Sequence, residues 1–199
     1  MNNEIRAIDF NTAEFRFADD DKRTLEGYAS VFGVAADLGR FSETIERGAF
    51  TRALDEQQDV RALVDHDSGR VIGRTKNGTL ELREDNRGLF TRIELPDTQD
   101  GRDISTLIAR GDLDAMSFGF TVKRDRWEQS NEKQMRYIED VDLFDVSVVA
   151  YPAYPDTSVA LRSMPENDLA IEEMIKTENI KNRFKLLTLG FKVSSWNKQ

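Results

Sequence analysis

Two stretches of the sequence, 115–122 and 141–150, carry apolar residues at alternate positions. A period of two places successive side chains on opposite faces of a β-strand. Shorter runs of strand-like composition occur at 25–33, 60–64, 71–75, 80–83 and 89–95. Helical spacing of apolar residues occurs in short stretches, at 46–57 and 103–110. Many strands and a few short helices predict an α+β fold, built as a mainly antiparallel β-barrel with a few helices around it.

The character of the sequence changes after Arg162. Up to that residue the chain carries the strand pattern, whereas the remainder combines helical spacing of apolar residues with a polar end. A length of 199 residues suits one domain with some excess of chain. We therefore expect a folded domain at residues 1–162 and a helical or flexible tail at 163–199.

The composition excludes several classes of function. A net charge of −9 disfavours nucleic acid or an anionic membrane as the main partner, because an acidic surface repels phosphate. The chain has no cysteine and one histidine, so thiolate and histidine-rich metal sites are excluded, and we expect no metal and no cofactor. The first residues, MNNEIRAIDF, lack the features of a secretory signal, and no apolar stretch is long enough to span a bilayer. We expect a soluble cytoplasmic protein that does not contact a membrane.

The only histidine, His66, follows an apolar run in the sequence LVDHD at 63–67. Histidine is the side chain that most readily exchanges protons near neutral pH, so His66 is the candidate for a general base. The neighbouring carboxylates of Asp65 and Asp67 would point elsewhere if this segment were extended. The alternative is a surface histidine in an acidic loop.

Ser117 lies in the strand predicted at 116–122. Alternation places Ser117, Gly119 and Thr121 on one face of that strand and bulky apolar side chains on the other. The small side chains would leave room for a substrate backbone beside the Ser117 hydroxyl. Alternatively, a face of small residues lets another element of the same protein pack closely.

Asp145 lies within the apolar strand predicted at 141–150. Alternation places Asp145 and Ser147 on the same face as Leu143, and makes Phe144 and the residues at alternate positions after it the core face. A carboxylate in such a strand costs free energy unless it is paired or hydrogen-bonded. Either His66 or an arginine could supply the partner.

Eight short motifs extend this pattern along the chain. They are GYASVFG at 27–33, ERGAF at 46–50, LVDHD at 63–67, IGRT at 72–75, RGL at 87–89, RGDLDAMSFGF at 110–120, DLFDVSVV at 142–149 and PAYPDT at 152–157. In this order they resemble the prohead protease family of tailed phages, whose fold is similar to that of the herpesvirus assembly proteases. The resemblance covers residues 23–162.

The resemblance implies a serine endopeptidase with a herpesvirus-protease-like fold, in which Ser117 is the nucleophile and His66 the base. The herpesvirus relatives use a second histidine as the third member; this chain has none, so the third group is a carboxylate or is absent. We assign that role to Asp145. Backbone N–H groups in the loop 152–157, at Ala153 and Tyr154, are the expected oxyanion donors.

The same resemblance implies the partners and the location. Expected substrates are scaffold segments, the major capsid protein and the protease itself, with possible self-association, inside the assembling prohead in the host bacterial cytoplasm. A non-enzymatic capsid-assembly or scaffold-binding protein that keeps the fold is the alternative. An esterase of another fold is disfavoured, because Ser117 does not lie in a G-x-S-x-G motif.

Overall fold

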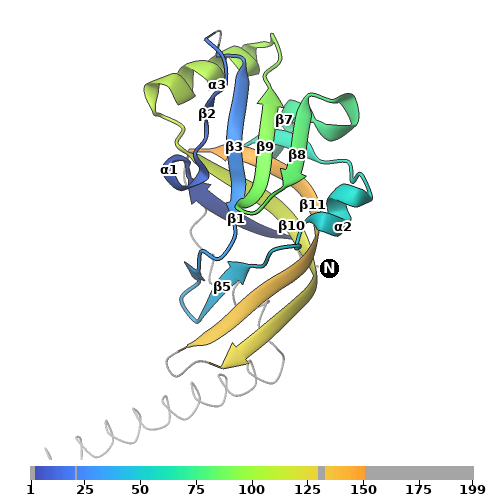
Figure 1. Cartoon of the computed structure of the whole chain (residues 1–199). Coiled ribbons are helices and arrows are strands. Elements are labelled where there is room, and N and C mark those ends of the chain that lie inside the picture. The colour runs from blue at the N-terminus through green and yellow to red at the C-terminus, as the bar shows by residue number, and fades with distance from the viewer. Residues whose placement is uncertain (1–2, 21, 130–132, 151–199) are drawn as a thin grey trace, which may run out of the picture. The chain divides into compact units, whose positions relative to one another are not determined.

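A computed structural model describes residues 3–20, 22–129 and 133–150. Within these ranges the strands form two sheets (Figure 1). The first contains, in order, β1 (Glu4–Asp9), β10 (Ala115–Gln129), β11 (Gln134–Val149), β5 (Phe41–Ile45) and β4 (Ala36–Asp37), with β6 (Arg61–Val64) on β11 and β7 (Asp67–Arg74) on β6. The second contains, in order, β2 (Arg16–Phe17), β3 (Thr24–Val31), β9 (Gly88–Glu94) and β8 (Leu80–Glu84).

The α-helices of the described ranges are short and join these strands. They are α1 (Phe10–Ala13), α2 (Thr51–Asp55) and α3 (Gln99–Arg110). The helix α3 begins where the Thr98 hydroxyl accepts a hydrogen bond from Gly101 N, and it ends at Gly111, whose φ of 81° suits a glycine. None of the helices in the described ranges has the length and apolar character needed to cross a membrane.

The predicted mainly-β architecture with a few helices is confirmed, but the described strands form two open sheets where we expected a closed barrel. The pairing is also less antiparallel than predicted. β11 is antiparallel to β10 but parallel to β5 along 134–138 and to β6 along 145–148. Alternation in a sequence predicts which face a side chain occupies and carries no information on which strands pair, so these parallel pairings had no signal. The predicted boundary at 162 lies outside the described residues.

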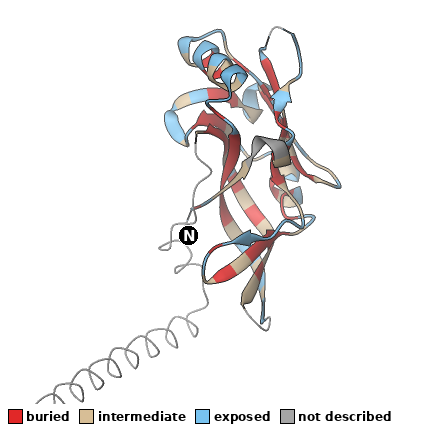
Figure 2. Cartoon of the chain, turned by 90° about the vertical axis from the view of Figure 1, so that its left-hand side faces the viewer, coloured by how far each residue is buried: buried red, intermediate tan, exposed pale blue. Residues whose placement is uncertain are grey.

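The hydrophobic core lies between the two sheets. β10 contributes Met116, Phe118 and Phe120 to it, and the second sheet contributes Leu89 and Ile93 of β9 among others. Buried residues accordingly recur along the long strands (Figure 2). The other face of β10 carries Ser117, so the core packing of its neighbours holds that serine in place.

The alternation of β11 changes phase at Phe144. Asp145 pairs with Gly119 of β10, whereas Leu143 pairs with the next residue, Phe120, so Phe144 is an extra residue on β11. Leu143 is therefore in the core, 2% exposed, and Phe144 is 41% exposed, the reverse of the predicted faces. Such a bulge re-aims the side chains that follow it. It turns Asp145 to the face opposite Leu143.

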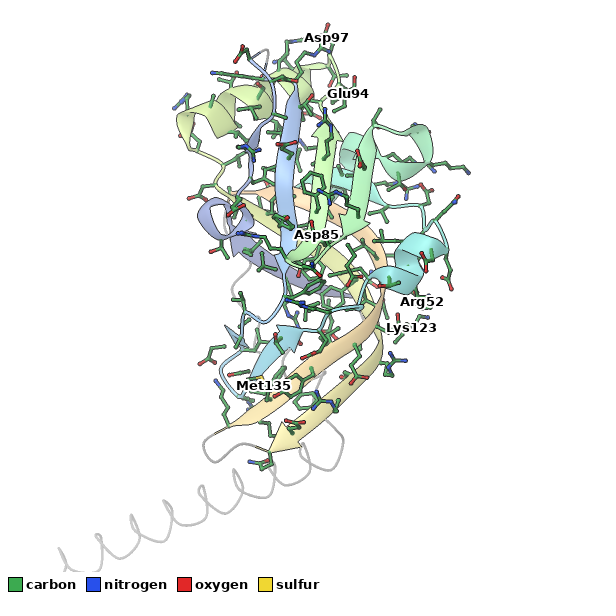
Figure 3. The ribbon with its side chains drawn as sticks, viewed as in Figure 1. Arg52, Asp85, Glu94, Asp97, Lys123 and Met135 are labelled. Atoms are coloured by element: carbon green, nitrogen blue, oxygen red, sulfur yellow. The ribbon has the colours of Figure 1, made fainter. Side chains whose placement is uncertain are left out.

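An ion cluster fixes α2 to the β10–β11 pair just before this bulge. Arg52 of α2 binds Asp142 through Nη2 at 2.8 Å, and Lys123 of β10 binds the same carboxylate at 2.7 Å. Both cations appear on the same side of the molecule in Figure 3. The hydrogen bond from Lys123, helped by Arg52, holds the pKa of Asp142 well below its usual range. The strand entering the bulge is thus anchored from two elements.

Candidate active site

Ser117, His66 and Asp145 lie in one hydrogen-bonded chain. The Nε2 atom of His66 is 2.7 Å from Ser117 Oγ, and its Nδ1 atom is 2.6 Å from Asp145 Oδ1. A carboxylate only accepts hydrogen bonds, so Nδ1 carries the proton shared with Asp145. In the neutral ring the lone pair of Nε2 then faces the serine hydroxyl. The three residues come from β10, β11 and the turn between β6 and β7.

The strands on both sides of β10 fix the position of Ser117. Ser117 is in register with Ala7 of β1 on one side and with Ser147 of β11 on the other. Its side chain is fully buried, and its hydroxyl lies 2.9 Å from the carbonyl oxygen of Arg6. The single hydroxyl proton therefore has two acceptors, His66 Nε2 and Arg6 O.

His66 occupies a tight turn. Asp65 and His66 have φ values of 51° and 57°, and they form the two-residue connection between β6 and β7. A two-residue hairpin with positive φ at both positions is a type I′ arrangement, which Asp and His tolerate better than most residues. Asp65 also ties the turn to β11: its N–H donates to Val148 O at 3.0 Å, and its Oδ1 accepts from Ala150 N at 3.2 Å.

Asp145 fills the space beside Gly119. A β-carbon at Gly119 would overlap Asp145 Oδ2 and would lie 3.2 Å from its Cγ. The small residue predicted to leave room for a substrate backbone therefore leaves room for this carboxylate. Asp145 Oδ1 accepts a second hydrogen bond, from Ser147 Oγ at 2.8 Å. Both carboxylate oxygens thus have defined positions.

The family described as Caudovirus prohead serine protease matches residues 8–170. The chain belongs to this family. The prohead protease of Escherichia phage T5 is 28% identical over 154 residues, which is 74% of this chain and 70% of the relative. Among solved structures, the bacteriophage T4 capsid assembly protease, gp21, is similar with a TM-score of 0.46 and 12% identity, over 65% of this chain and 82% of that one.

The predicted family is confirmed, and with it the predicted activity class, a prohead serine protease. The match reaches residue 170, beyond the domain end that we predicted at Arg162. The predicted oxyanion donors, Ala153 and Tyr154, lie outside the described residues. That assignment stays a prediction.

Three residues of the candidate site were not assigned their observed roles from the sequence. Ser147 contacts both Asp145 and His66, Gly119 makes space for the carboxylate, and Arg6 accepts from the Ser117 hydroxyl through its backbone. The i, i+2 spacing of Asp145 and Ser147 was a usable signal, since such residues share a strand face. Nothing in the sequence pairs Gly119 with Asp145, because their contact depends on strand register.

Proposed function

We propose that Ser117, His66 and Asp145 carry out peptide-bond hydrolysis in this prohead protease, as nucleophile, general base and orienting acid. The observation that carries the proposal is the 2.7 Å separation of Ser117 Oγ and His66 Nε2, with the opposite ring nitrogen held by Asp145 at 2.6 Å. This geometry meets the hydrogen-bond reach that a base needs to take a hydroxyl proton.

The chemistry is acyl transfer. Ser117 Oγ attacks the carbonyl carbon of the scissile peptide while its proton passes to His66 Nε2. The C–N bond then breaks as the imidazolium returns that proton to the leaving amine, which leaves an acyl-enzyme. A water molecule attacks the ester, His66 takes its proton and returns it to Ser117, and the second product leaves. Asp145 keeps its bond to Nδ1 throughout and stabilises the imidazolium.

The described arrangement is a closed one. Ser117 is fully buried, and its hydroxyl has the Arg6 carbonyl as a second acceptor. A substrate carbonyl therefore reaches Oγ only after the groups that cover Ser117 have moved. Attack also requires the hydroxyl proton to point at His66 Nε2 instead of Arg6 O.

The substrates follow from the family. Membership of the prohead protease family supports substrates among the proteins of the assembling shell, and we propose scaffold segments, the major capsid protein and the protease itself as the individual targets. The location inside the prohead, the oxyanion role of Ala153 and Tyr154 and the herpesvirus-protease-like architecture stay predictions. So does the assignment of 163–199 as a tail.

The test is co-expression of the full chain with its cognate major capsid protein. Ser117→Ala and His66→Ala should each reduce processing by about 10⁴–10⁶-fold, because such residues act as a unit. Ser105→Ala is the matched control, since that serine lies on α3 and donates only to Lys22 O. A fluorophosphonate should label Ser117 in the parent chain. Normal processing by a folded Ser117→Ala variant would end the assignment.

A further inference from the structure

We propose that Ser147 is a positioning residue, which holds the Asp145 carboxylate and through it selects the tautomer of His66. The inference rests on the proposed function and adds a fourth side chain to it. Ser147 does not touch the position of the scissile bond; it acts through its neighbours.

Three contacts place Ser147 at this point. Its Oγ donates to Asp145 Oδ1 at 2.8 Å and lies 3.3 Å from His66 Nδ1. It is also in register with Ser117 across the β10–β11 pair, and its side chain is fully buried. The bulge at Phe144 puts Ser147 and Asp145 on this face together. Ser147 therefore contacts both the His66 ring and the Asp145 carboxylate, and it lies on the strand next to the one that carries Ser117.

The Ser147 hydroxyl has one proton to donate, and two acceptors lie near it. Asp145 Oδ1 accepts one hydrogen bond from His66 Nδ1 and a second from Ser147 Oγ. With its proton committed to the carboxylate at 2.8 Å, Ser147 has none to offer Nδ1 at 3.3 Å. The opposite tautomer would set the lone pair of Nδ1 against the carboxylate without any donor between them. The ring is thus kept in the tautomer whose Nε2 accepts from Ser117.

The carboxylate is fixed at both ends. Ser147 and His66 hold Oδ1, whereas Oδ2 lies over Gly119, where a β-carbon would overlap it. Removing the Ser147 hydroxyl leaves Oδ1 with one donor and frees the carboxylate to rotate about its last side-chain bond. If Ser147 had only a structural role, removing its hydroxyl would leave the tautomer of His66 unchanged.

The single histidine makes the test direct. In the full chain labelled with ¹⁵N-histidine, every imidazole nitrogen signal belongs to His66. At a pH where the ¹⁵N signals are those of a neutral ring, the parent chain should show one tautomer, with the proton on Nδ1. Ser147→Ala should show a mixture of tautomers, and its processing of capsid protein should fall about 10–100-fold, the loss of one hydrogen bond to a charged group.

Ser30→Ala is the matched control, because Ser30 is a buried serine on β3 in the other sheet. It should keep the parent tautomer and the parent rate. In the background of Asp145→Asn, adding Ser147→Ala should cost little further activity, since Ser147 acts through that acid. An unchanged tautomer in Ser147→Ala overturns the proposal, whatever the rate does, and so does an undiminished cost in the Asp145→Asn background.

The tautomer measurement also works in Ser117→Ala, which needs no activity. The two proposals therefore fail separately. Processing by Ser117→Ala would remove the nucleophile assignment, and the ¹⁵N spectra would still decide the role of Ser147.

Discussion

The carboxylate of Asp145 occupies the place where a side chain at position 119 would begin. Gly119 and Asp145 are direct partners across the β10–β11 pair, and a β-carbon on Gly119 would overlap Oδ2. Gly119 does not have a positive φ, so its backbone would accept alanine. Glycine is therefore needed at position 119 for the space it leaves, which is filled by the carboxylate of Asp145, the hydrogen-bond partner of His66.

Gly119→Ala should therefore displace the Asp145 carboxylate while the chain still folds. A shift of about 1 Å in a catalytic group costs on the order of 100-fold in rate, and we expect at least that loss in processing of the capsid protein. Gly69→Ala on β7 is the control, because its β-carbon would meet only the carboxylate of Asp67, at 3.2 Å. Full activity in a folded Gly119→Ala variant would show that Asp145 need not hold its place.

The bulge at Phe144 makes a prediction about stability. Leu143→Ala should lower the free energy of unfolding by about 2–5 kcal/mol, since it empties a core position. Phe144→Ala should cost about 1 kcal/mol or less, because that ring is 41% exposed. Urea denaturation of both variants measures the difference. Equal costs, or a larger cost at Phe144, would place Phe144 in the core and remove the bulge.

The sequence predicts the positions that are decided by the burial of single side chains, and it does not predict those decided by pairing between strands. Alternation placed Met116, Phe118 and Phe120 on one apolar face, and that face is in the core, because burial of apolar area acts on each residue separately. It failed at Leu143 and Phe144, which are equally apolar, so the sequence offers no mark of an inserted residue. Backbone hydrogen bonding between strands decides that phase, and it involves no side chain.

The residues of the candidate site likewise fall into those that the sequence identifies and those that it does not. His66, Ser117 and Asp145 could be named because their side-chain chemistry is uncommon in their surroundings, and because the motifs around them resemble a family. Ser147 and Gly119 are ordinary strand residues by composition, and their roles arise from register with partners far along the chain. Asp65 and His66 follow an apolar run in the sequence, which does not show whether the chain continues extended there or turns; the structure has a tight turn with positive φ at both residues.

The turn at Asp65 gives a third prediction. Asp65→Asn should change the free energy of unfolding by no more than about 0.5 kcal/mol, because asparagine also tolerates positive φ and keeps an acceptor for Ala150 N. Asp65→Val should cost about 1–3 kcal/mol from the backbone alone, and it also removes that hydrogen bond. Thermal and urea unfolding would measure both. A valine variant as stable as the asparagine variant would exclude a positive φ at this position.

A buried ion network joins three strands of the first sheet. Arg136 of β11, 3% exposed, binds Glu4 of β1 at 2.9 Å and Glu43 of β5 at 3.0 Å. Arg6 of β1 binds the same two carboxylates. Removing Arg136 leaves the two buried carboxylates of Glu4 and Glu43 with a single cation, Arg6, so one negative charge is no longer balanced. Arg136→Met should therefore cost about 3–5 kcal/mol at neutral pH, whereas Arg126→Met, on the exposed part of β10, should cost no more than about 1 kcal/mol.

The cost of Arg136→Met should also depend on pH. Burial alone would raise the pKa of Glu4, but the hydrogen bonds and charge of Arg136, with those of Arg6, outweigh it and hold that pKa below its ordinary value. A depressed pKa in the folded chain stabilises it above the unfolded pKa, and this stability is lost as pH falls through the folded one. In Arg136→Met, Arg6 alone faces the carboxylates of Glu4 and Glu43, so protonation of Glu4 removes the negative charge that is no longer balanced. The gap in urea midpoint between parent and variant should therefore narrow as the pH is lowered from about 7 to about 4. A constant or widening gap would mean that Arg136 does not hold Glu4 in its charged form.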